Sequence, residues 1–242
     1  MLIDRADNQK GLAFVMHGLG GFKEQPQIKT IVEAFLENGY TTVRFDTTNA
    51  IGESDGKYED ATVTNYYEDL EDVIEWTRKQ EWYNEPFVLA GHSIGGMCIT
   101  VFSEKHKARV KAIAPLSVVI SGTLFLATTK QEDLQEWERT GVWQRNSHSK
   151  PGALLKLNWR QFKDDLLKYN LMSEAHSLTM PVLIIVGEFD DSTPPEHQKI
   201  LYDILPGKKE MHIIKGARHT FKEKRHLAEL KVISCGWIQR IL

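Results

Sequence analysis

The sequence has few cysteines, no long apolar run and no apolar N-terminal segment. Its two cysteines, Cys98 and Cys235, cannot build a disulfide framework, and their scarcity is typical of a reducing compartment. A transmembrane helix needs about 18 or more consecutive apolar residues, and no such run is present. The chain begins MLIDRADNQK, with charges where a secretion signal needs an apolar core. These absences predict a cytoplasmic protein with no membrane span.

An excess of positive charge is also missing. The chain carries 30 Lys and Arg against 33 Asp and Glu, a formal net charge of −3, whereas nucleic-acid-binding domains are usually basic. We therefore expect no nucleic-acid partner. Hydrophobic residues make up 41% and charged residues 26%, which is the composition of a folded globular protein. The length of 242 residues fits one α/β domain that carries an insertion.

Signatures of metal and cofactor binding are absent from the sequence. Neither HExxH nor CxxC occurs. The glycine-rich stretch HGLGG at 17–21 lacks both the spacing of a dinucleotide-binding loop and the Lys-Ser/Thr pair of a phosphate-binding loop. We therefore expect no cofactor and no metal, and we interpret Cys98 as a small buried apolar residue.

Short apolar runs alternate with segments of helical periodicity along most of the chain. Strands are predicted at 12–16, 41–45, 87–90, 110–116, 181–186 and 209–214. Helices are predicted at 28–38, 63–82, 94–106, 196–205 and 222–242. Fully apolar strands that alternate with helices indicate a parallel sheet covered on both faces, which is the α/β class.

The alternation breaks in a polar, aromatic-rich segment that shows no clear strand. We predict a helical insertion at 119–178 and a core made of 1–118 and 179–242. Aromatic side chains of the insertion either line a pocket or pack its helices onto the core. They include Trp137, Trp143 and Trp159.

The clearest chemical motif is Gly91-His92-Ser93-Ile94-Gly95, which matches G-x-S-x-G between a predicted strand and a predicted helix. Small residues at the two glycine positions let strand and helix approach, and the tight turn lifts the serine above the sheet edge. N–H groups at the start of the following helix favour a developing anion. A chance glycine turn is the alternative, and the strand–helix context favours Ser93 as a nucleophile.

A serine nucleophile needs a base and a carboxylate that orients the base. Of nine histidines, His219 follows the last predicted strand, which places it at the same sheet edge as Ser93. The carboxylate is expected after the strand at 181–186. There Asp190 is preferred over Asp191, and Glu188 is the weakest choice. The order serine, aspartate, histidine is that of one large hydrolase fold.

Four motifs together resemble serine hydrolases of the α/β-hydrolase superfamily. The motifs are HGLGG at 17–21, GHSIGG at 91–96, GEFDDSTPP at 187–195 and GARHTF at 216–221. The segment 45–63 also resembles bacterial carboxylesterases, especially the feruloyl (cinnamoyl) esterase and prolyl-aminopeptidase-like group. In this family the aspartate stands three residues after a glycine and four before a proline, which implies Asp190.

The resemblance implies further parts of the site and of the fold. The backbone N–H groups of Leu19 and Ile94 would form the oxyanion hole, and His17 would support the loop instead of acting as a base. Only eleven residues precede Leu12, so the family's N-terminal hairpin would be shortened and the sheet would have six or seven strands. The insertion at 119–178 would form a cap over the site.

The resemblance implies a carboxylesterase that acts on a small-molecule ester through an acyl-enzyme. Ser93 would attack, His219 would accept its proton, and Asp190 would orient His219. The same triad also serves monoacylglycerol lipases, thioesterases and amide or peptide hydrolases, so these stay open. A non-catalytic ligand-binding protein of the same fold ranks lower, because all three triad candidates are present. A homodimer also stays open.

Overall fold

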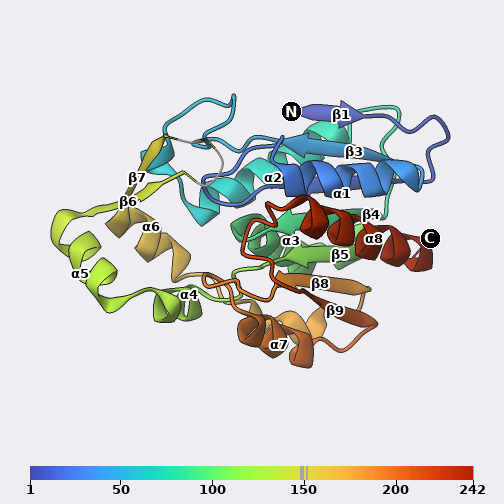
Figure 1. The fold of residues 1–242 in the computed structure, drawn as a ribbon. Helices are drawn as coiled ribbons and strands as arrows, with labels where there is room; N and C mark the ends of the chain where they lie inside the picture. Colours follow the sequence, from blue (N-terminus) through green and yellow to red (C-terminus); the bar gives the residue numbers. More distant parts are fainter. Residues whose placement is uncertain (148–149, 151, 242) are drawn as a thin grey trace.

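The structure, a computed structural model, describes residues 1–147, 150 and 152–241. Its centre is a seven-stranded sheet with the order β1-β3-β2-β4-β5-β8-β9 (Figure 1). The strands are β1 Leu2–Asp4, β2 Gly11–Met16, β3 Tyr40–Phe45, β4 Phe87–His92, β5 Val110–Leu116, β8 Val182–Gly187 and β9 Lys209–Ile214. All neighbours in this sheet are parallel except β1, which pairs antiparallel with β3.

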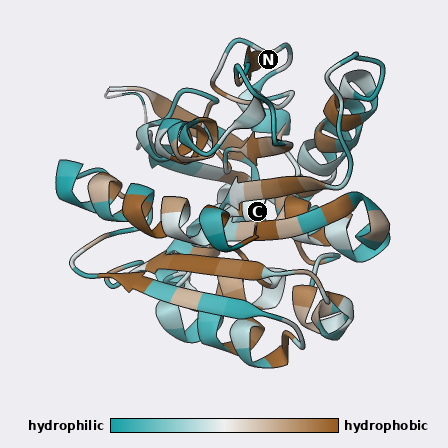
Figure 2. Ribbon diagram, turned by 90° about the vertical axis from the view of Figure 1, so that its right-hand side faces the viewer, coloured by the Kyte–Doolittle hydropathy of each residue, from teal (hydrophilic) through white to brown (hydrophobic). Residues whose placement is uncertain are grey.

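The predicted parallel sheet is confirmed. All six residues of β2 are buried, as are all six of β4 and of β8, because helices cover both faces of the sheet. Successive side chains of β2 enter opposite cores: Phe14 lies in one apolar cluster and Val15 in the other. Figure 2 shows apolar residues concentrated in strands, while the helices mix apolar and polar residues. The edge strand β1 has only three residues.

Five helices flank the sheet. Helices α1 (Pro26–Glu37) and α8 (Lys224–Ile241) contribute to one apolar cluster. Helices α2 (Val63–Thr77), α3 (Ile94–Lys105) and α7 (Pro195–Ile204) contribute to the other. Helix α2 ends earlier than the prediction of 63–82, because no residue from 78 to 86 is buried and nothing holds a further turn against the sheet. None of the helices in the described ranges combines the length and the apolar character needed to cross a bilayer.

The segment between β5 and β8 projects beyond the end of the sheet (Figure 1). It contains α4 (Gly122–Thr128), α5 (Gln131–Thr140), β6 (Val142–Asn146), β7 (Leu154–Asn158) and α6 (Trp159–Leu166). Helices form the larger share, as expected, but the prediction that the segment has no strand is wrong. Strands β6 and β7 form an antiparallel pair that buries Trp143, Leu155 and Leu157 on alternate positions. Two five-residue strands are too short for this alternation to stand out in the sequence.

Short 3-10 helices complete the chain. They span Tyr58–Asp60, Lys107–Arg109, Leu171–Ser173 and Ala175–Ser177.

Backbone hydrogen bonds join the two ends of the projecting segment. Gly122 N–H donates to Tyr169 O (3.2 Å), and Leu171 N–H donates to Ile120 O (2.8 Å). The segment is therefore anchored to the core at both ends.

Candidate active site

Ser93 lies in the sharp turn between β4 and α3. Its backbone adopts φ 55° and ψ −118°, a conformation that residues with a side chain rarely adopt. The turn requires the flanking glycines: a Cβ on Gly95 would lie 2.3 Å from His17 O, and one on Gly91 would lie 2.5 Å from Gly95 O. The G-x-S-x-G spacing thus reflects close backbone packing around a strained serine.

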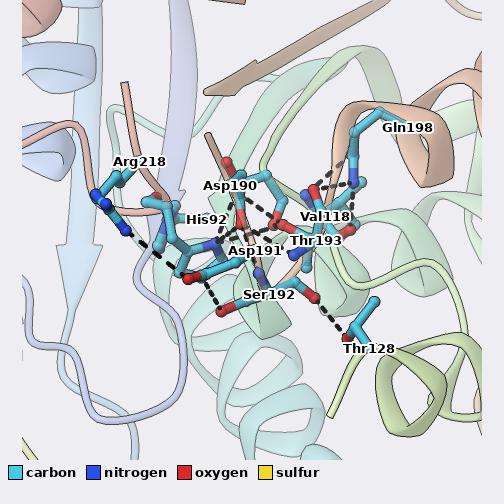
Figure 3. A network of polar contacts seen from close by, with 11 residues as sticks. His92, Val118, Thr128, Asp190, Asp191, Ser192, Thr193, Gln198 and Arg218 are labelled. Atoms are coloured by element: carbon cyan, nitrogen blue, oxygen red, sulfur yellow. Dashed lines mark hydrogen bonds and ion pairs between the residues drawn. The ribbon is translucent and has the colours of Figure 1, made fainter. Parts of the chain in front are cut away.

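Asp190 and His219 form a hydrogen-bonded pair at the carboxyl edge of the sheet. Asp190 follows β8 and is 3% exposed, and its Oδ2 lies 2.9 Å from His219 Nδ1. Thr193 donates to the same carboxylate from its N–H (2.9 Å) and from its Oγ1 (3.0 Å) (Figure 3). Since the carboxylate accepts, the imidazole donates from Nδ1 and its Nε2 is left as an acceptor.

The environment keeps Asp190 ionised. Burial by itself raises the pKa of Asp190, but the charge and hydrogen bond of His219 and the N–H of Thr193 outweigh burial and lower the pKa to about 2. The two competing carboxylates make other contacts. Asp191 has a 79% exposed side chain that lies 3.9 Å from Arg218, and Glu188 accepts from Gly216 N–H at 2.8 Å. Of the three carboxylates, only Asp190 contacts His219 among the described residues.

Ser93 and His219 line one cavity of about 360 Å³. Within the described ranges the Ser93 hydroxyl forms no hydrogen bond to His219, so the two share the cavity without direct contact between their polar atoms. Apolar side chains form much of the wall: Leu19, Ile94, Phe125, Trp143 and Phe162. Cationic side chains also line the cavity: Arg145, Arg218 and Lys222. No cluster of three or more His, Cys, Asp or Glu suited to a metal occurs in the part of the chain described.

The three tryptophans of the projecting segment divide between the two roles left open. Trp143 lines the cavity. Trp159 is fully buried and is not in the cavity wall, and its ring centre lies 4.9 Å from that of Trp137 and 6.2 Å from that of Trp143. Trp137 also packs on Trp143, at 4.9 Å between ring centres. One tryptophan therefore faces the cavity while the other two support it from behind.

The HGLGG stretch forms a turn against Ser93. Gly21 N–H donates to Gly18 O at 2.9 Å, and a Cβ on Gly18 would lie 2.8 Å from Ser93 Cβ. Leu19 in this turn and Ile94 at the start of α3 both line the cavity that holds Ser93. The structure thus places the two predicted oxyanion-hole residues on either side of the serine, one in a turn and one at a helix N-terminus.

His17 supports this turn from inside the protein. It is fully buried; Thr47 N–H donates to its Nε2 (3.2 Å), so its Nδ1 carries the proton and donates to Gly18 O (2.9 Å). Burial lowers the pKa of His17. Both ring nitrogens are engaged by the backbone and the side chain does not line the cavity, which agrees with a supporting role.

His92, next to the serine, is a second buried histidine that the motif did not single out. Its Nε2–H donates to the backbone carbonyl of His219 (2.7 Å), and the two rings lie 4.7 Å apart. Burial, followed by the nearby His219, lowers the pKa of His92 to about 3. His92 therefore stays neutral and holds the main chain that carries His219. The residue at position x of G-x-S-x-G can vary, so the motif gives no signal for this contact. The contact of Thr193 with Asp190 was also missed, because no motif marks it.

Because His92 is buried in its neutral form, the stability of the fold depends on pH. Below pH 6.5 the unfolded chain protonates His92, whereas the folded chain does not until about pH 3, so stability is lost as the pH falls through this window. We expect the unfolding free energy of the wild type to fall, between pH 7 and pH 4.5, by about 2–3 kcal/mol more than that of His92→Gln. Urea denaturation at the two pH values measures this difference. An equal fall in both proteins would contradict the assignment of His92 as a buried neutral group.

A family model and a curated relative both match this sequence. The sequence model of the X-Pro dipeptidyl-peptidase (S15) family matches residues 7–151. An uncharacterized 31.7 kDa protein from the traX-finO intergenic region of Escherichia coli is 28% identical over 264 residues, covering 96% of this chain and 91% of that protein.

Solved structures show the same fold. Est1E from Butyrivibrio proteoclasticus, solved with bound ferulic acid, has a TM-score of 0.81 at 21% identity and covers 99% of this chain and 93% of its own. Alpha/beta hydrolase domain-containing protein 10 from mouse has a TM-score of 0.80 at 19% identity, with coverage of 99% and 94%. The fold is that of the α/β-hydrolase superfamily, and because the family model spans more than half of the sequence, the chain belongs to the X-Pro dipeptidyl-peptidase (S15) family.

Proposed function

We propose that the protein is a serine carboxylesterase that hydrolyses esters of small-molecule acids through an acyl-enzyme. One observation carries the proposal: a strained, glycine-flanked Ser93 lines the same cavity as His219, and buried Asp190 holds His219 from behind the cavity wall. A serine hydroxyl is a weak nucleophile unless a base takes its proton, and a histidine held by an ionised carboxylate is such a base.

In the proposed reaction Ser93 Oγ forms a bond to the ester carbonyl carbon while its proton passes to His219 Nε2. Asp190 holds Nδ1–H and stabilises the imidazolium that forms. The N–H groups of Leu19 and Ile94 stabilise the tetrahedral oxyanion. His219 then returns the proton to the leaving alcohol as the carbon–oxygen bond breaks. A water molecule, deprotonated by His219, releases the acid from Ser93 in the same way.

The projecting segment acts in this proposal as the cap. We assign the catalytic core to 1–118 and 179–242 and the cap to 119–178. The cap supplies Phe125, Trp143 and Phe162 to the wall of the cavity that Ser93 also lines, which supports a role in choosing the acyl group. An aromatic wall favours acids with an apolar or aromatic group. Est1E, which shares the fold, binds ferulic acid, an aromatic acid.

Cleavage of an amide next to proline is the second candidate, because the matching family model describes an X-Pro dipeptidyl-peptidase. A dipeptidyl-peptidase has to hold a free N-terminal ammonium group, which calls for an available carboxylate. The carboxylates that line the cavity, those of Asp191 and Glu223, are exposed and each lies beside an arginine (Arg218 at 3.9 Å and Arg225 at 2.8 Å), so they would hold an ammonium group only weakly. The charge pattern therefore favours an ester over a dipeptidyl amide.

A substrate panel tests the proposal. We expect kcat/KM for p-nitrophenyl esters of short and aromatic acids to exceed that for an X-Pro p-nitroanilide, a monoacylglycerol and an acyl thioester. A fluorophosphonate probe should label Ser93 in the folded protein. Preference for the X-Pro p-nitroanilide would establish the peptidase instead. A folded protein that neither hydrolyses any member of the panel nor reacts with the probe would be a ligand-binding member of the fold.

A further inference from the structure

Arg145 reaches from strand β6 of the projecting segment to the turn beside Ser93. Its Nη2 donates to the carbonyl oxygen of Leu19 (2.9 Å) and to Tyr58 Oη (3.3 Å). The guanidinium also lies 5.0 Å from the centre of the Trp143 ring. A Cβ on Gly20 would lie 2.8 Å from Nη2, so a side chain at this position would displace the guanidinium. The contact joins parts of the chain that lie 126 residues apart.

The turn at Gly18–Gly21 explains why a donor at Leu19 O matters. The Gly21 N–H bond to Gly18 O closes the turn, and of the two central residues only Gly20 has positive φ, at 66°. This is the pattern of a type II turn. A type I turn has the same ends but a flipped central peptide, with the Leu19 carbonyl on the opposite side. A hydrogen bond from Arg145 to that carbonyl therefore selects the type II form.

The closed turn in turn orients the amide of Leu19. In the planar peptide between residues 18 and 19, the carbonyl of Gly18 and the N–H of Leu19 point in opposite directions. Two donors hold that carbonyl, His17 Nδ1–H (2.9 Å) and Gly21 N–H (2.9 Å). The second exists only while the turn stays closed. Both peptides that flank Leu19 are therefore held: the one that carries its N–H by His17 and Gly21, and the one that carries its carbonyl by Arg145.

The environment of Arg145 is unusual for an arginine. Its side chain is half-buried and its Nε is enclosed without a hydrogen-bond partner. Among the described residues it forms no ion pair, unlike Arg139 on α5, which lies 2.8 Å from Glu136. Enclosing a guanidinium without a carboxylate has a cost, and a protein tolerates such a cost most readily where the cation has a task.

We propose that Arg145 is a positioning residue that links the cap to the oxyanion hole. By holding the Leu19–Gly20 peptide, it restrains rotation about Leu19 and so steadies the N–H that faces the tetrahedral intermediate, a contribution that strand β6 makes to the oxyanion hole. This inference rests on the proposed function and assigns to that site a residue outside the triad.

The test uses a neutral p-nitrophenyl ester and three variants of the full chain. Arg145→Met keeps the apolar stem and removes the donors, Arg145→Lys keeps one charged donor, and Arg139→Met removes an exposed arginine of the same segment as the matched control. We expect Arg145→Met to lower kcat about 10- to 100-fold with little change in KM, somewhat less than the loss of a whole oxyanion donor. Arg145→Lys should recover part of this loss, and Arg139→Met should behave as wild type.

A second readout separates positioning from simple packing. An arylboronic acid, whose tetrahedral adduct on Ser93 places an oxygen in the oxyanion hole, should lose affinity for Arg145→Met by about the same factor as kcat/KM. The product acid should bind unchanged. Unchanged kcat in Arg145→Met would overturn the inference, as would a defect confined to KM for anionic esters, because that pattern marks a substrate-binding cation.

Failure of the proposed function and failure of the role of Arg145 give different results. If wild-type turnover persists in Ser93→Ala, the proposed function fails. If wild-type turnover depends on Ser93 and Arg145→Met keeps it, only the role of Arg145 fails. Circular dichroism and thermal melting confirm that each variant folds. If Arg145→Met does not fold, Arg145→Lys carries the test, and wild-type kcat with wild-type boronate affinity in that variant would overturn the requirement for the Arg145 guanidinium.

Discussion

Replacing Ser93 by alanine is expected to lower kcat for a p-nitrophenyl ester by about 10⁵- to 10⁶-fold. The reason is that the variant lacks the nucleophile of the proposed reaction, while the cavity and the backbone N–H groups stay in place. The residual rate should be that of a site that binds and polarises the ester without attacking it. Steady-state kinetics together with loss of fluorophosphonate labelling measure the effect.

The expected loss is chemical and not structural. The Ser93 hydroxyl makes no hydrogen bond to His219 among the described residues, and alanine retains a Cβ, so the strained turn keeps its geometry. The thermal midpoint should therefore stay near that of the wild type. Ser173→Ala, on an exposed residue, is the matched control and should retain full activity. Substantial turnover in Ser93→Ala would refute the nucleophile assignment.

The second large effect is expected for Asp190→Asn, which should lower kcat by about 10⁴-fold. An amide at this position donates a hydrogen bond towards His219 Nδ1 and so favours the tautomer with the proton on Nε2. That tautomer cannot accept the proton of Ser93. Because the two side chains have the same shape, the loss reports on the tautomer of the base and not on a cavity. Single-turnover acylation rates measure it directly.

Asp191→Asn is the matched comparison, because Asp191 was the competing candidate and its side chain is exposed. Its effect on kcat should be far smaller. A larger loss in Asp191→Asn than in Asp190→Asn would reassign the carboxylate of the triad.

The pH dependence of stability tests Asp190 independently. With a pKa of about 2, ionised Asp190 contributes about 2 kcal/mol to the unfolding free energy above pH 4, and this contribution is lost as the pH falls towards 2. Asp190→Asn should lack this acid-dependent part.

Much of this protein follows from local sequence patterns. Buried parallel strands are apolar along their whole length, so segments such as 12–16 and 181–186 are recognisable without the structure. The elbow at Ser93 is recognisable because only small residues allow the backbone approach that Gly91 and Gly95 make. His219 and a carboxylate within 188–191 follow from chain order, since residues after parallel strands collect at one edge of the sheet.

The choice between neighbouring carboxylates did not follow from the residues alone. Asp190 and Asp191 are adjacent and chemically identical, and only family resemblance separated them. In the structure they differ sharply, because one is enclosed by Thr193 and His219 while the other extends into solvent beside Arg218. One step along the chain turns the side chain from the protein interior to the solvent. The buried, hydrogen-bonded carboxylate is the one that can hold an imidazole.

By itself, then, the sequence determined the sheet, its order of elements and the residue types that meet at its edge, because these depend on periodicity and on short glycine spacings. Only the tertiary structure decided the strand pair β6–β7, the hold of His92 on the carbonyl of His219, and the reach of Arg145 to Leu19. The last two contacts join residues more than a hundred positions apart. No local pattern encodes such contacts, because their geometry exists only after distant segments have packed together.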